Sequence, residues 1–375
     1  MNASSVRWDP SWKGDTVFAD LGNILRQIEP LDSAWVRRAE MHQASLTKPP
    51  GSLGRLEELA NRVVAIQRSL TPKVERARIV VFAADHGVTA EGVAPYPSAV
   101  TGQMVANFLG GGAGVNALAR VARAEVEVVD IGVASDLGQI AGLRQRRVAA
   151  GTRNMAREAT MTQDQAEAAI AVGLEMGRDA IVTGVDMIGL GEMGIGNSTA
   201  ASAVAAALTG LPVADVTGRG TGADDAMLAH KVSVIEQALQ RHHPDPADAL
   251  DVLVKVGGFE LAGLAGVALA GAAGRKLVVT DGFIATAAAA LAVRMCPAAG
   301  EYLVAAHRST EPGHTALLTM LGQEPLLDLR MRLGEGTGAA LAFMLIRAAV
   351  AAFTEMATFA SAGVSNRSES PDAAV

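Results

Sequence analysis

The sequence predicts an α/β protein in which a mostly parallel β-sheet is covered by helices on both faces. Short runs rich in β-branched residues alternate with longer alanine-rich segments of helical length, and this alternation is typical of parallel sheets. Apolar residues make up 50% of the 375 residues and aromatic residues only 3%, so the core must consist largely of Ala, Val, Leu and Gly. The chain is long enough for a large core and a smaller accessory domain.

The expected elements follow one another in a regular order. Residues 22–70 carry an amphipathic helical pattern that breaks at Lys48-Pro49-Pro50-Gly51, and the last long segment, 338–357, is also helical in pattern. Strands are expected at Arg78–Ala84, Glu125–Ile131, Ala180–Thr183, Asp251–Val256, Lys276–Thr280 and Glu301–Ala305. Helices are expected at 99–109, 113–123, 163–178, 197–208, 225–240, 259–273 and 284–295.

This order predicts two structural units. Residues 76–335 are expected to form a large α/β catalytic domain, and the helices of residues 1–75 and 336–360 are expected to pack together as a smaller domain. The segment 361–375 is rich in Ser, Ala and Asn, so we expect a disordered tail there.

Charge and composition argue against several classes of protein. The formal net charge is −7, no cluster of Lys or Arg stands out, and few aromatic residues are available to stack on bases, so we expect no nucleic-acid partner. The single cysteine, Cys296, excludes an internal disulfide and fits a reducing cytoplasm. Glu260, Arg294 and Arg347 interrupt the longest apolar stretches, which leaves no uninterrupted run of the ~18 to 20 residues that a membrane span needs. A soluble, cytoplasmic protein is expected.

Polar and glycine-rich motifs follow the predicted strands, at the edge of the sheet where ligands bind in this architecture. The motifs are Asp85-His86-Gly87, Gly257-Gly258-Phe259-Glu260, Asp281-Gly282 and His307-Arg308-Ser309, after the first, fourth, fifth and sixth predicted strands. Neighbouring side chains on an extended backbone point to opposite sides, so Asp85 and His86 are poorly placed to grip one metal ion. Neither an HExxH nor a Walker sequence is present, which makes a metal site and ATP hydrolysis minor alternatives.

Two glutamates in glycine-rich segments are the main candidates for chemistry. Glu335 lies in LGEGTG (333–338) and Glu192 lies in GEMGIGN (191–197). Glycine lets a ligand approach the backbone closely, and each segment precedes an apolar helix whose first N–H groups could meet an anion. The pair indicates an enzyme that acts on a phosphorylated small molecule with a carboxylate as the base. The alternative is two ordinary turns in which the acids cap the helices.

Three further residues each allow a functional and a structural interpretation. Ser98 either caps the helix predicted at 99–109 or contacts a ligand, and Gln103, in the second turn of that helix, would face the same region. Lys231 lies two turns into the helix behind GRGTGADD (218–225). It either reaches a phosphate as a compact point charge or stands as a solvated surface lysine.

Taken together, the motifs resemble the nicotinate-nucleotide–dimethylbenzimidazole phosphoribosyltransferase family of cobalamin biosynthesis. The matching segments are KPPGSLGRLEELA (48–60), ADHGV (84–88), YPSAVTGQMVANFLGGGAGVNALAR (96–120), GEMGIGNSTAA (191–201), GRGTGADD (218–225), KVGGFE (255–260), DGF (281–283), HRSTEPGH (307–314) and LRMRLGEGTGAALA (329–342). They span the chain from about residue 30 to residue 355, so the resemblance leaves out the first ~25 residues and the tail.

The resemblance implies a Rossmann-like sheet, a small domain of terminal helices, a homodimer, and neither a metal nor another cofactor. It implies transfer of the phosphoribosyl group from nicotinate mononucleotide to 5,6-dimethylbenzimidazole, giving α-ribazole 5′-phosphate and nicotinate with inversion at the anomeric carbon. Glu335 would accept the proton of the attacking base, and Glu192 would be the supporting acid. Contacts to phosphate and ribose carry over to Gly194, Lys231 and Gly282, with Ser309 nearby, and the base pocket carries over to Ser98, Gln103, Met193, Leu333 and Gly338.

Two questions stay open at this point. A helix N-terminus behind Glu335 would lower its pKa, whereas burial against an aromatic substrate and the neighbouring Glu192 would raise it. We expect the increase to prevail with substrate bound. The motifs also leave the acceptor open among dimethylbenzimidazole, other benzimidazoles, purines and phenols. A non-catalytic nucleotide-binding protein is a further alternative, which the presence of both loop glutamates disfavours.

Overall fold

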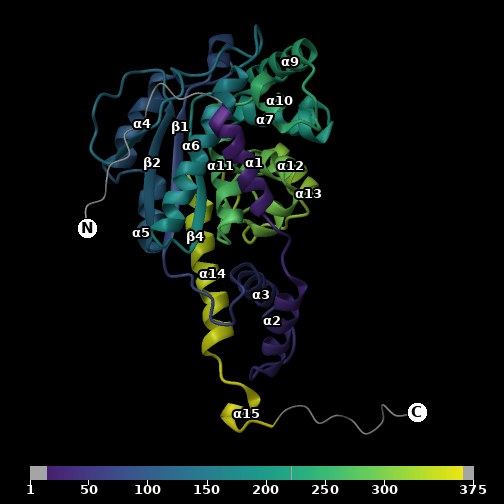
Figure 1. The fold of residues 1–375 in the computed structure, drawn as a ribbon. Coiled ribbons are helices and arrows are strands. Elements are labelled where there is room, and N and C mark those ends of the chain that lie inside the picture. Colours follow the sequence, from purple (N-terminus) through teal and green to yellow (C-terminus); the bar gives the residue numbers. More distant parts are fainter. Residues whose placement is uncertain (1–14, 221, 366–375) are drawn as a thin grey trace.

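The computed structural model describes residues 15–365 apart from residue 221. Its centre is a six-stranded sheet in the order β3-β2-β1-β4-β5-β6, of which Figure 1 labels β1, β2 and β4. The strands are β1 (Ala77–Ala84), β2 (Ala124–Gly132), β3 (Leu143–Gln145), β4 (Met187–Met193), β5 (Leu277–Thr280) and β6 (Leu303–Ala305). All neighbouring strands run parallel, which confirms the predicted fold class. The strand order is that of the Rossmann fold.

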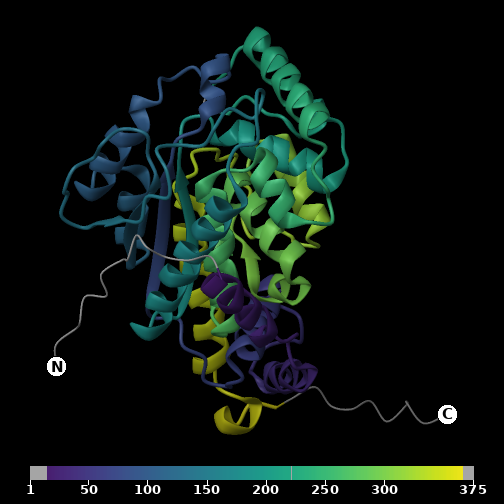
Figure 2. The same ribbon diagram turned by 45° about the horizontal axis from the view of Figure 1, so that its top comes forward.

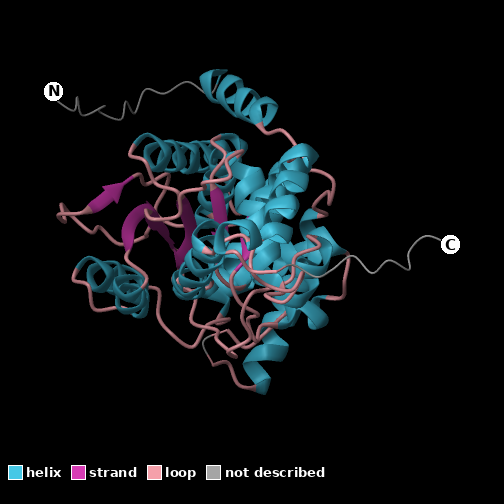
Figure 3. Ribbon diagram, turned by 90° about the horizontal axis from the view of Figure 1, so that it is seen from below, coloured by secondary structure: helices cyan, strands magenta, loops and turns pink. Residues whose placement is uncertain are grey.

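Helices cover both faces of this sheet, as Figures 2 and 3 show. The α-helices are α1 (Asp15–Gln27), α2 (Ser33–Ser45), α3 (Arg55–Gln67), α4 (Ala99–Leu109), α5 (Gly114–Val121), α6 (Gln163–Val182), α7 (Asn197–Thr209), α8 (Val213–Val216), α9 (Asp225–His242), α10 (Ala249–Val256), α11 (Phe259–Ala273), α12 (Phe283–Met295), α13 (Pro312–Met320), α14 (Thr337–Glu355) and α15 (Phe359–Ala362), with short 3-10 turns at Gly87–Glu91 and Pro297–Tyr302. The buried helix α11 packs on one face beside α6 and α12, and α5 and α14 pack on the other. The seven helices expected between the strands are all present, with small shifts at their ends.

The central strand β4 was not predicted, because its sequence MIGLGEM contains two glycines that weaken a strand pattern. Both glycines are required by close packing. A Cβ at Gly191 would lie 2.5 Å from the carbonyl oxygen of Glu335, and one at Gly189 would lie 3.1 Å from Ala339 and Phe343 of α14. Glu192 therefore belongs to a strand and not to a glycine-rich loop. The short edge strand β3 was also missed.

Two predicted strands are helical. Asp251–Val256 lies in α10, where the buried residues Ala249, Val252, Leu253 and Val256 follow the helical period. The side chain of Asp248 caps this helix by accepting from the N–H groups of Leu250 and Asp251. Consequently Gly257–Glu260 follows a helix and opens α11, so this motif does not follow a strand. Ala180–Thr183 is the end of α6 and its C-cap, because the alanine-rich helix continues through its β-branched residues.

Of the terminal helices, α2 and α3 lie beyond the amino ends of the strands, beside the last turns of α14. Helix α3 packs against α2 and α14, while α1 packs against α6 and α11 (Figure 1). Whether these helices form a separate domain within the ranges 1–75 and 336–360 stays a proposal. The expected tail overlaps α15 at residues 361–362, and residues 1–14 and 366–375 lie outside the described residues.

One helix of the described chain, α14, is long and apolar enough by length and composition to cross a membrane. However, 56% of its apolar window is buried inside the structure. Its first turn also touches β4 and the chain around Asp281. We therefore interpret α14 as a core helix.

Candidate functional site

The strand order reverses between β1 and β4, and parallel α/β folds bind ligands at such a point beyond the carboxyl ends of the strands. A cavity of about 30 Å³ lies there, which is room for roughly one water molecule. It is lined by Glu192, Gly282, Phe283, Ile284, His307, Ser309, Glu311, Arg332, Leu333 and Gly334. Four of the predicted site residues, Glu192, Gly282, Ser309 and Leu333, are thus brought together.

Glu192 stands at the end of β4 and its side chain is buried. Its Oε2 accepts a hydrogen bond from the side-chain amide of Asn197, in the first turn of α7. Its Oε1 accepts from the backbone N–H of Glu335 at 3.4 Å. Burial raises the pKa of Glu192 to about 8, and the charges of Asp281 and Glu260 add to the increase. Glu192 is therefore protonated at neutral pH.

Glu335 occupies an unusual backbone position between two glycines. Its φ is +64°, and the φ of Gly334 and Gly336 is also positive, which is rare for a residue with a side chain. The buried carboxylate accepts a hydrogen bond at 3.0 Å from the N–H of Val115, in the first turn of α5. Burial raises the pKa of Glu335, and the hydrogen bond from Val115 opposes the increase. The hydrogen bonds that lower the pKa come from the first turn of α5 and not from α14.

Asp281 fixes the start of the helix behind Glu335. One carboxylate oxygen of Asp281 accepts from Gly336 N–H at 3.0 Å and the other accepts from Gly338 N–H. These N–H groups are therefore occupied, and α14 does not offer them to an anion as expected from the sequence. A Cβ at Gly338 would lie 2.1 Å from His307 and 2.7 Å from Asp281, which explains the glycine. Asp281 lies in one of the motifs that follow the predicted strands, but the sequence alone indicates no role for it.

A cation and an acid hold the loop between α8 and α9. Lys231 in α9 is buried, and its ammonium donates to the hydroxyl of Ser198 at 2.9 Å and to the carbonyl of Gly218 at 3.3 Å. Burial lowers the pKa of Lys231 to about 8. Glu311 accepts from Gly220 N–H at 3.0 Å, and its other carboxylate oxygen has no hydrogen-bond partner within the described residues. The interpretation of Lys231 as a solvated surface lysine is wrong.

Helix α12 begins at the cavity. Its N-cap, Gly282, provides no side-chain bond to the first turn, and Gly282, Phe283 and Ile284 all line the cavity. Beside them, Ser309 is positioned by His314, whose Nδ1 accepts from the Ser309 N–H at 2.9 Å. Burial lowers the pKa of His314 to about 3, so its ring is neutral and can accept. An uncapped helix start next to a hydroxyl is suited to a phosphate.

The remaining predicted residues do not line the cavity. Met193 ends β4, and Gly194 follows in a tight turn where a Cβ would lie 2.2 Å from the carbonyl oxygen of Ala84. Ser98 is the N-cap residue of α4, but its hydroxyl makes no capping bond and lies 3.2 Å from that of Thr89. Gln103 is exposed on α4.

A buried pair of ionisable side chains behind Glu192 was not anticipated. His86 and Glu260 are both buried, with 2.9 Å between Nε2 and Oε1. The charge of Glu260 raises the pKa of His86, although burial acts in the opposite direction. Both residues lie in the motifs of the sequence analysis, yet only the fold brings them together, because α11 starts beside the end of β1. Among the described residues, no group of three or more His, Cys, Asp or Glu side chains is placed to hold a metal ion.

Comparison with known proteins gives a consistent result. A family model described as phosphoribosyltransferase matches residues 28–364. The chain is 55% identical to the nicotinate-nucleotide–dimethylbenzimidazole phosphoribosyltransferase of Geobacter metallireducens over 344 residues, covering 92% of this chain and 98% of that one. It is 54% identical to the enzyme of the same name from Chloroflexus aggregans, covering 93% and 99%. A crystal structure of that enzyme from Thermus thermophilus superposes with a TM-score of 0.85 at 46% identity, covering 90% of this chain and all of that one.

Proposed function

The chain belongs to the nicotinate-nucleotide–dimethylbenzimidazole phosphoribosyltransferase family, and from this membership we propose how its own residues perform the transfer. The enzyme moves the phosphoribosyl group of nicotinate mononucleotide to dimethylbenzimidazole in cobalamin biosynthesis. One benzimidazole nitrogen forms a bond to the anomeric carbon from the face opposite nicotinate. The bond to the pyridinium nitrogen breaks, and its electron pair neutralises the departing ring. The product is then α-ribazole 5′-phosphate, with inverted configuration.

The proton released in this step goes to Glu335. Positive charge develops on the benzimidazole as the new bond forms, which acidifies the N–H of its second nitrogen, and a carboxylate within hydrogen-bond reach can accept that proton. The observation that carries the assignment is the strained position of Glu335, whose backbone contacts Glu192 at the end of β4. Burial raises the pKa of Glu335 and makes it a stronger base. The leaving nicotinate needs no proton, because its ring nitrogen becomes neutral on departure.

Glu192 acts beside Glu335 as a neutral acid. Its pKa of about 8 keeps a proton on the carboxyl group, so Glu192 can donate a hydrogen bond to the substrate without repelling the ionised Glu335. Two adjacent acids with different surroundings can thereby take separate tasks.

The phosphate is proposed to bind at the start of α12. Gly282 and Ser309 line the cavity there, and Lys231 is a buried cation that holds the loop at Gly218. Gly194 would contact the ribose. The base would lie between Met193, Leu333 and Gly338, with Ser98 and Gln103 at the outer edge. Positioning and electrostatics would then supply most of the rate acceleration.

We also propose a cytoplasmic homodimer. Leu329 is 56% exposed, Leu333 is 59% exposed and Tyr96 is 51% exposed, and such apolar side chains beside a site are suited to contact a second subunit. Sedimentation of the purified protein across a concentration series would test the assembly, and a monomer at every concentration would contradict it.

The experiment that tests the function supplies nicotinate mononucleotide with a panel of dimethylbenzimidazole, unsubstituted benzimidazole, adenine and a phenol. Mass spectrometry identifies each product and competition gives the preference. NMR of the anomeric proton assigns the configuration. A β-configured product would overturn the inversion, and absence of turnover with every base would overturn the proposed activity.

A further inference from the structure

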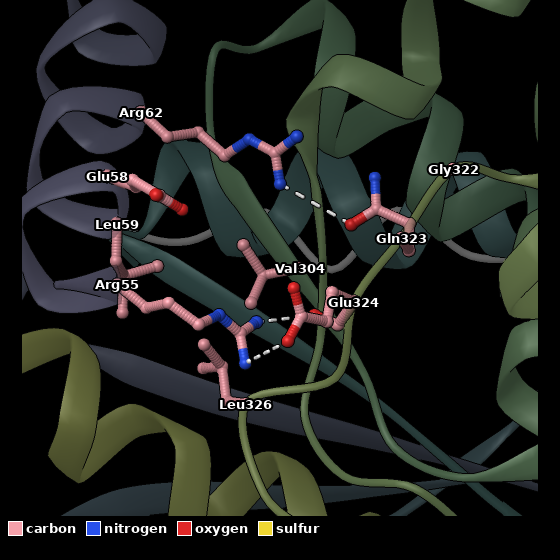
Figure 4. A pocket seen from close by; sticks show the side chains of 9 residues that line it. All are labelled: Arg55, Glu58, Leu59, Arg62, Val304, Gly322, Gln323, Glu324 and Leu326. Carbon is pink, nitrogen blue, oxygen red and sulfur yellow. Dashed lines mark hydrogen bonds and ion pairs between the residues drawn. The ribbon is translucent and has the colours of Figure 1, made fainter.

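A second cavity, of about 280 Å³, lies between α3 and the segment that follows α13 (Figure 4). Leu59, Val304 and Leu326 form its apolar wall, and the side chains of Arg55 and Arg62 enter it from α3. We call it the α3 pocket. None of its lining residues lines the catalytic cavity. Its volume is close to the lower end of the ~300 to 1,000 Å³ typical of small-molecule sites.

Arg62 brings a charge into this pocket that no carboxylate of the described chain neutralises directly. Its Nη1 donates to the carbonyl of Leu303 at 2.9 Å and to Gln323 Oε1 at 3.4 Å. Within the described residues, Nε and Nη2 of Arg62 have no hydrogen-bond partner, and no carboxylate lies within 4.0 Å of its guanidinium. Burial lowers the pKa of Arg62, and the charges of Glu301 and Glu58 oppose this only in part.

The other arginine of the pocket, Arg55, is by contrast paired with a carboxylate. Arg55 donates to the carbonyl oxygens of Pro325 and Glu324, both at 2.7 Å, and lies 3.3 Å from the carboxylate of Glu324. Glu58, one turn before Arg62 on α3, also lines the pocket, and its side chain is exposed to solvent. The pocket therefore has one ion-paired arginine, Arg55, and one arginine, Arg62, with free donors.

We propose that the α3 pocket binds a small carboxylate with an apolar body, held by Arg62 and packed against Leu59, Val304 and Leu326. Nε and one Nη of a guanidinium present two parallel N–H donors that match the two oxygens of a carboxylate. The apolar wall selects an organic acid over a fully hydrated inorganic anion. A bound carboxylate would also supply the negative charge that the half-buried guanidinium of Arg62 lacks.

The test uses the full chain saturated with nicotinate mononucleotide, so that the catalytic cavity is filled. Benzoate is the probe, and benzamide is its neutral counterpart. Saturation-transfer NMR should detect benzoate and not benzamide. Arg62→Gln should weaken benzoate binding at least about tenfold, as expected for a charge-assisted bidentate contact. Arg37→Gln, which changes an exposed arginine on α2, should leave the affinity unchanged.

A second variant guards against loss of binding through misfolding. Gln323→Glu places a carboxylate beside Arg62 Nη1, so it should block benzoate while the protein unfolds at a temperature near that of the parent. Equal benzoate binding by Arg62→Gln, or equal binding of benzamide by the parent, would overturn the proposal. Displacement of benzoate by inorganic phosphate at a lower concentration than benzoate itself requires would overturn the choice of a carboxylate.

Discussion

Glu335 and Glu192 are adjacent acids whose surroundings differ at the level of single atoms. Glu335 accepts from the start of α5, which favours its ionised form. Glu192 accepts from Asn197 and from the backbone of Glu335, yet it faces the charges of Asp281 and Glu260. Burial raises the pKa of both acids. Only Glu335 accepts a hydrogen bond from the start of a helix, which stabilises its negative charge. This difference supports Glu335 as the base and Glu192 as the neutral acid.

Glu335→Gln should therefore reduce turnover and spare binding. The amide keeps the size of the side chain but cannot accept a proton, so kcat should fall at least ~10²-fold, the typical contribution of a general base. The affinity for nicotinate mononucleotide, measured by calorimetry without the acceptor, should stay close to that of the parent. Glu236→Gln, at an exposed position of α9, is the control. Turnover near that of the parent would contradict the role of Glu335.

Glu192→Gln should change how stability depends on pH. The folded pKa of Glu192 is about 8 and its ordinary value is 4.5, so both states are protonated below pH 4.5 and ionisation costs nothing there. Between these two values the unfolded chain loses the proton while the folded chain keeps it, which progressively destabilises the parent. Above pH 8 Glu192 is ionised in both states, so the destabilisation of the parent no longer changes with pH.

Glu192→Gln cannot ionise, so its free energy of unfolding does not fall with pH in this way. Relative to the parent, the free energy of unfolding of Glu192→Gln should rise by roughly 3 kcal/mol or more between pH 5 and pH 8, since one pKa unit corresponds to about 1.4 kcal/mol. Urea unfolding at several pH values measures the difference, with Glu236→Gln as the control. A difference that stays constant across this range would show that Glu192 is not buried in its neutral form.

At the scale of elements, Asp281 couples β5 to the start of α14. It follows β5 directly and binds the N–H groups of Gly336 and Gly338. The Glu335 turn is thereby held between β4 on one side and Asp281 on the other. The charge of Asp281 also raises the pKa of both Glu192 and Glu335, so this single residue affects the geometry and the electrostatics of the site.

Asp281→Asn should separate these two effects in the pH profile. Removing a negative neighbour lowers the pKa of Glu335, so the acidic limb of kcat/KM should move to lower pH. One N–H of α14 would face the new amide group, and kcat should fall by roughly tenfold or more as the turn loosens. Asp164→Asn, in the first turn of α6, should leave the profile in place. An unshifted acidic limb would contradict the electrostatic role of Asp281.

The elements that could be predicted are those in which local pattern and tertiary packing agree. The strand β1 and the helices α4 and α11 begin and end close to their expected residues. Prediction failed where packing overrode local preference. In β4, glycines serve the close approach of Glu335 and α14, and in α10 a run of valines is helical because one side is buried and Asp248 caps its start.

At the scale of the whole molecule, the sequence could predict which motifs gather at the site but not which atoms meet there. Ser309 and Gly282 follow neighbouring parallel strands, so their proximity follows from the fold class. The contact of Glu335 with the start of α5 and the pairing of His86 with Glu260 join residues 220 and 174 positions apart. Such contacts depend on helix placement, which local periodicity does not encode.

Arg332 links two distant segments across the cavity and connects the fold to substrate entry. Its Nη1 donates to the carbonyl of Gly220 at 2.8 Å, joining the loop before α14 to the loop before α9, and its side chain lines the cavity. We infer from this bond that the two loops move together when a nucleotide enters the site.

Arg332→Gln should weaken this link between the loops. KM for nicotinate mononucleotide should rise by roughly tenfold, the order of one charge-assisted hydrogen bond, with a smaller change in kcat. Hydrogen exchange should accelerate in residues 217–220 and 330–336 together, because the bond restrains both loops at once. Arg330→Gln, an exposed position on the same loop, is the matched control. Faster exchange in only one of the two segments would show that the two loops open independently. In that case Arg332 would bind substrate without joining the loops.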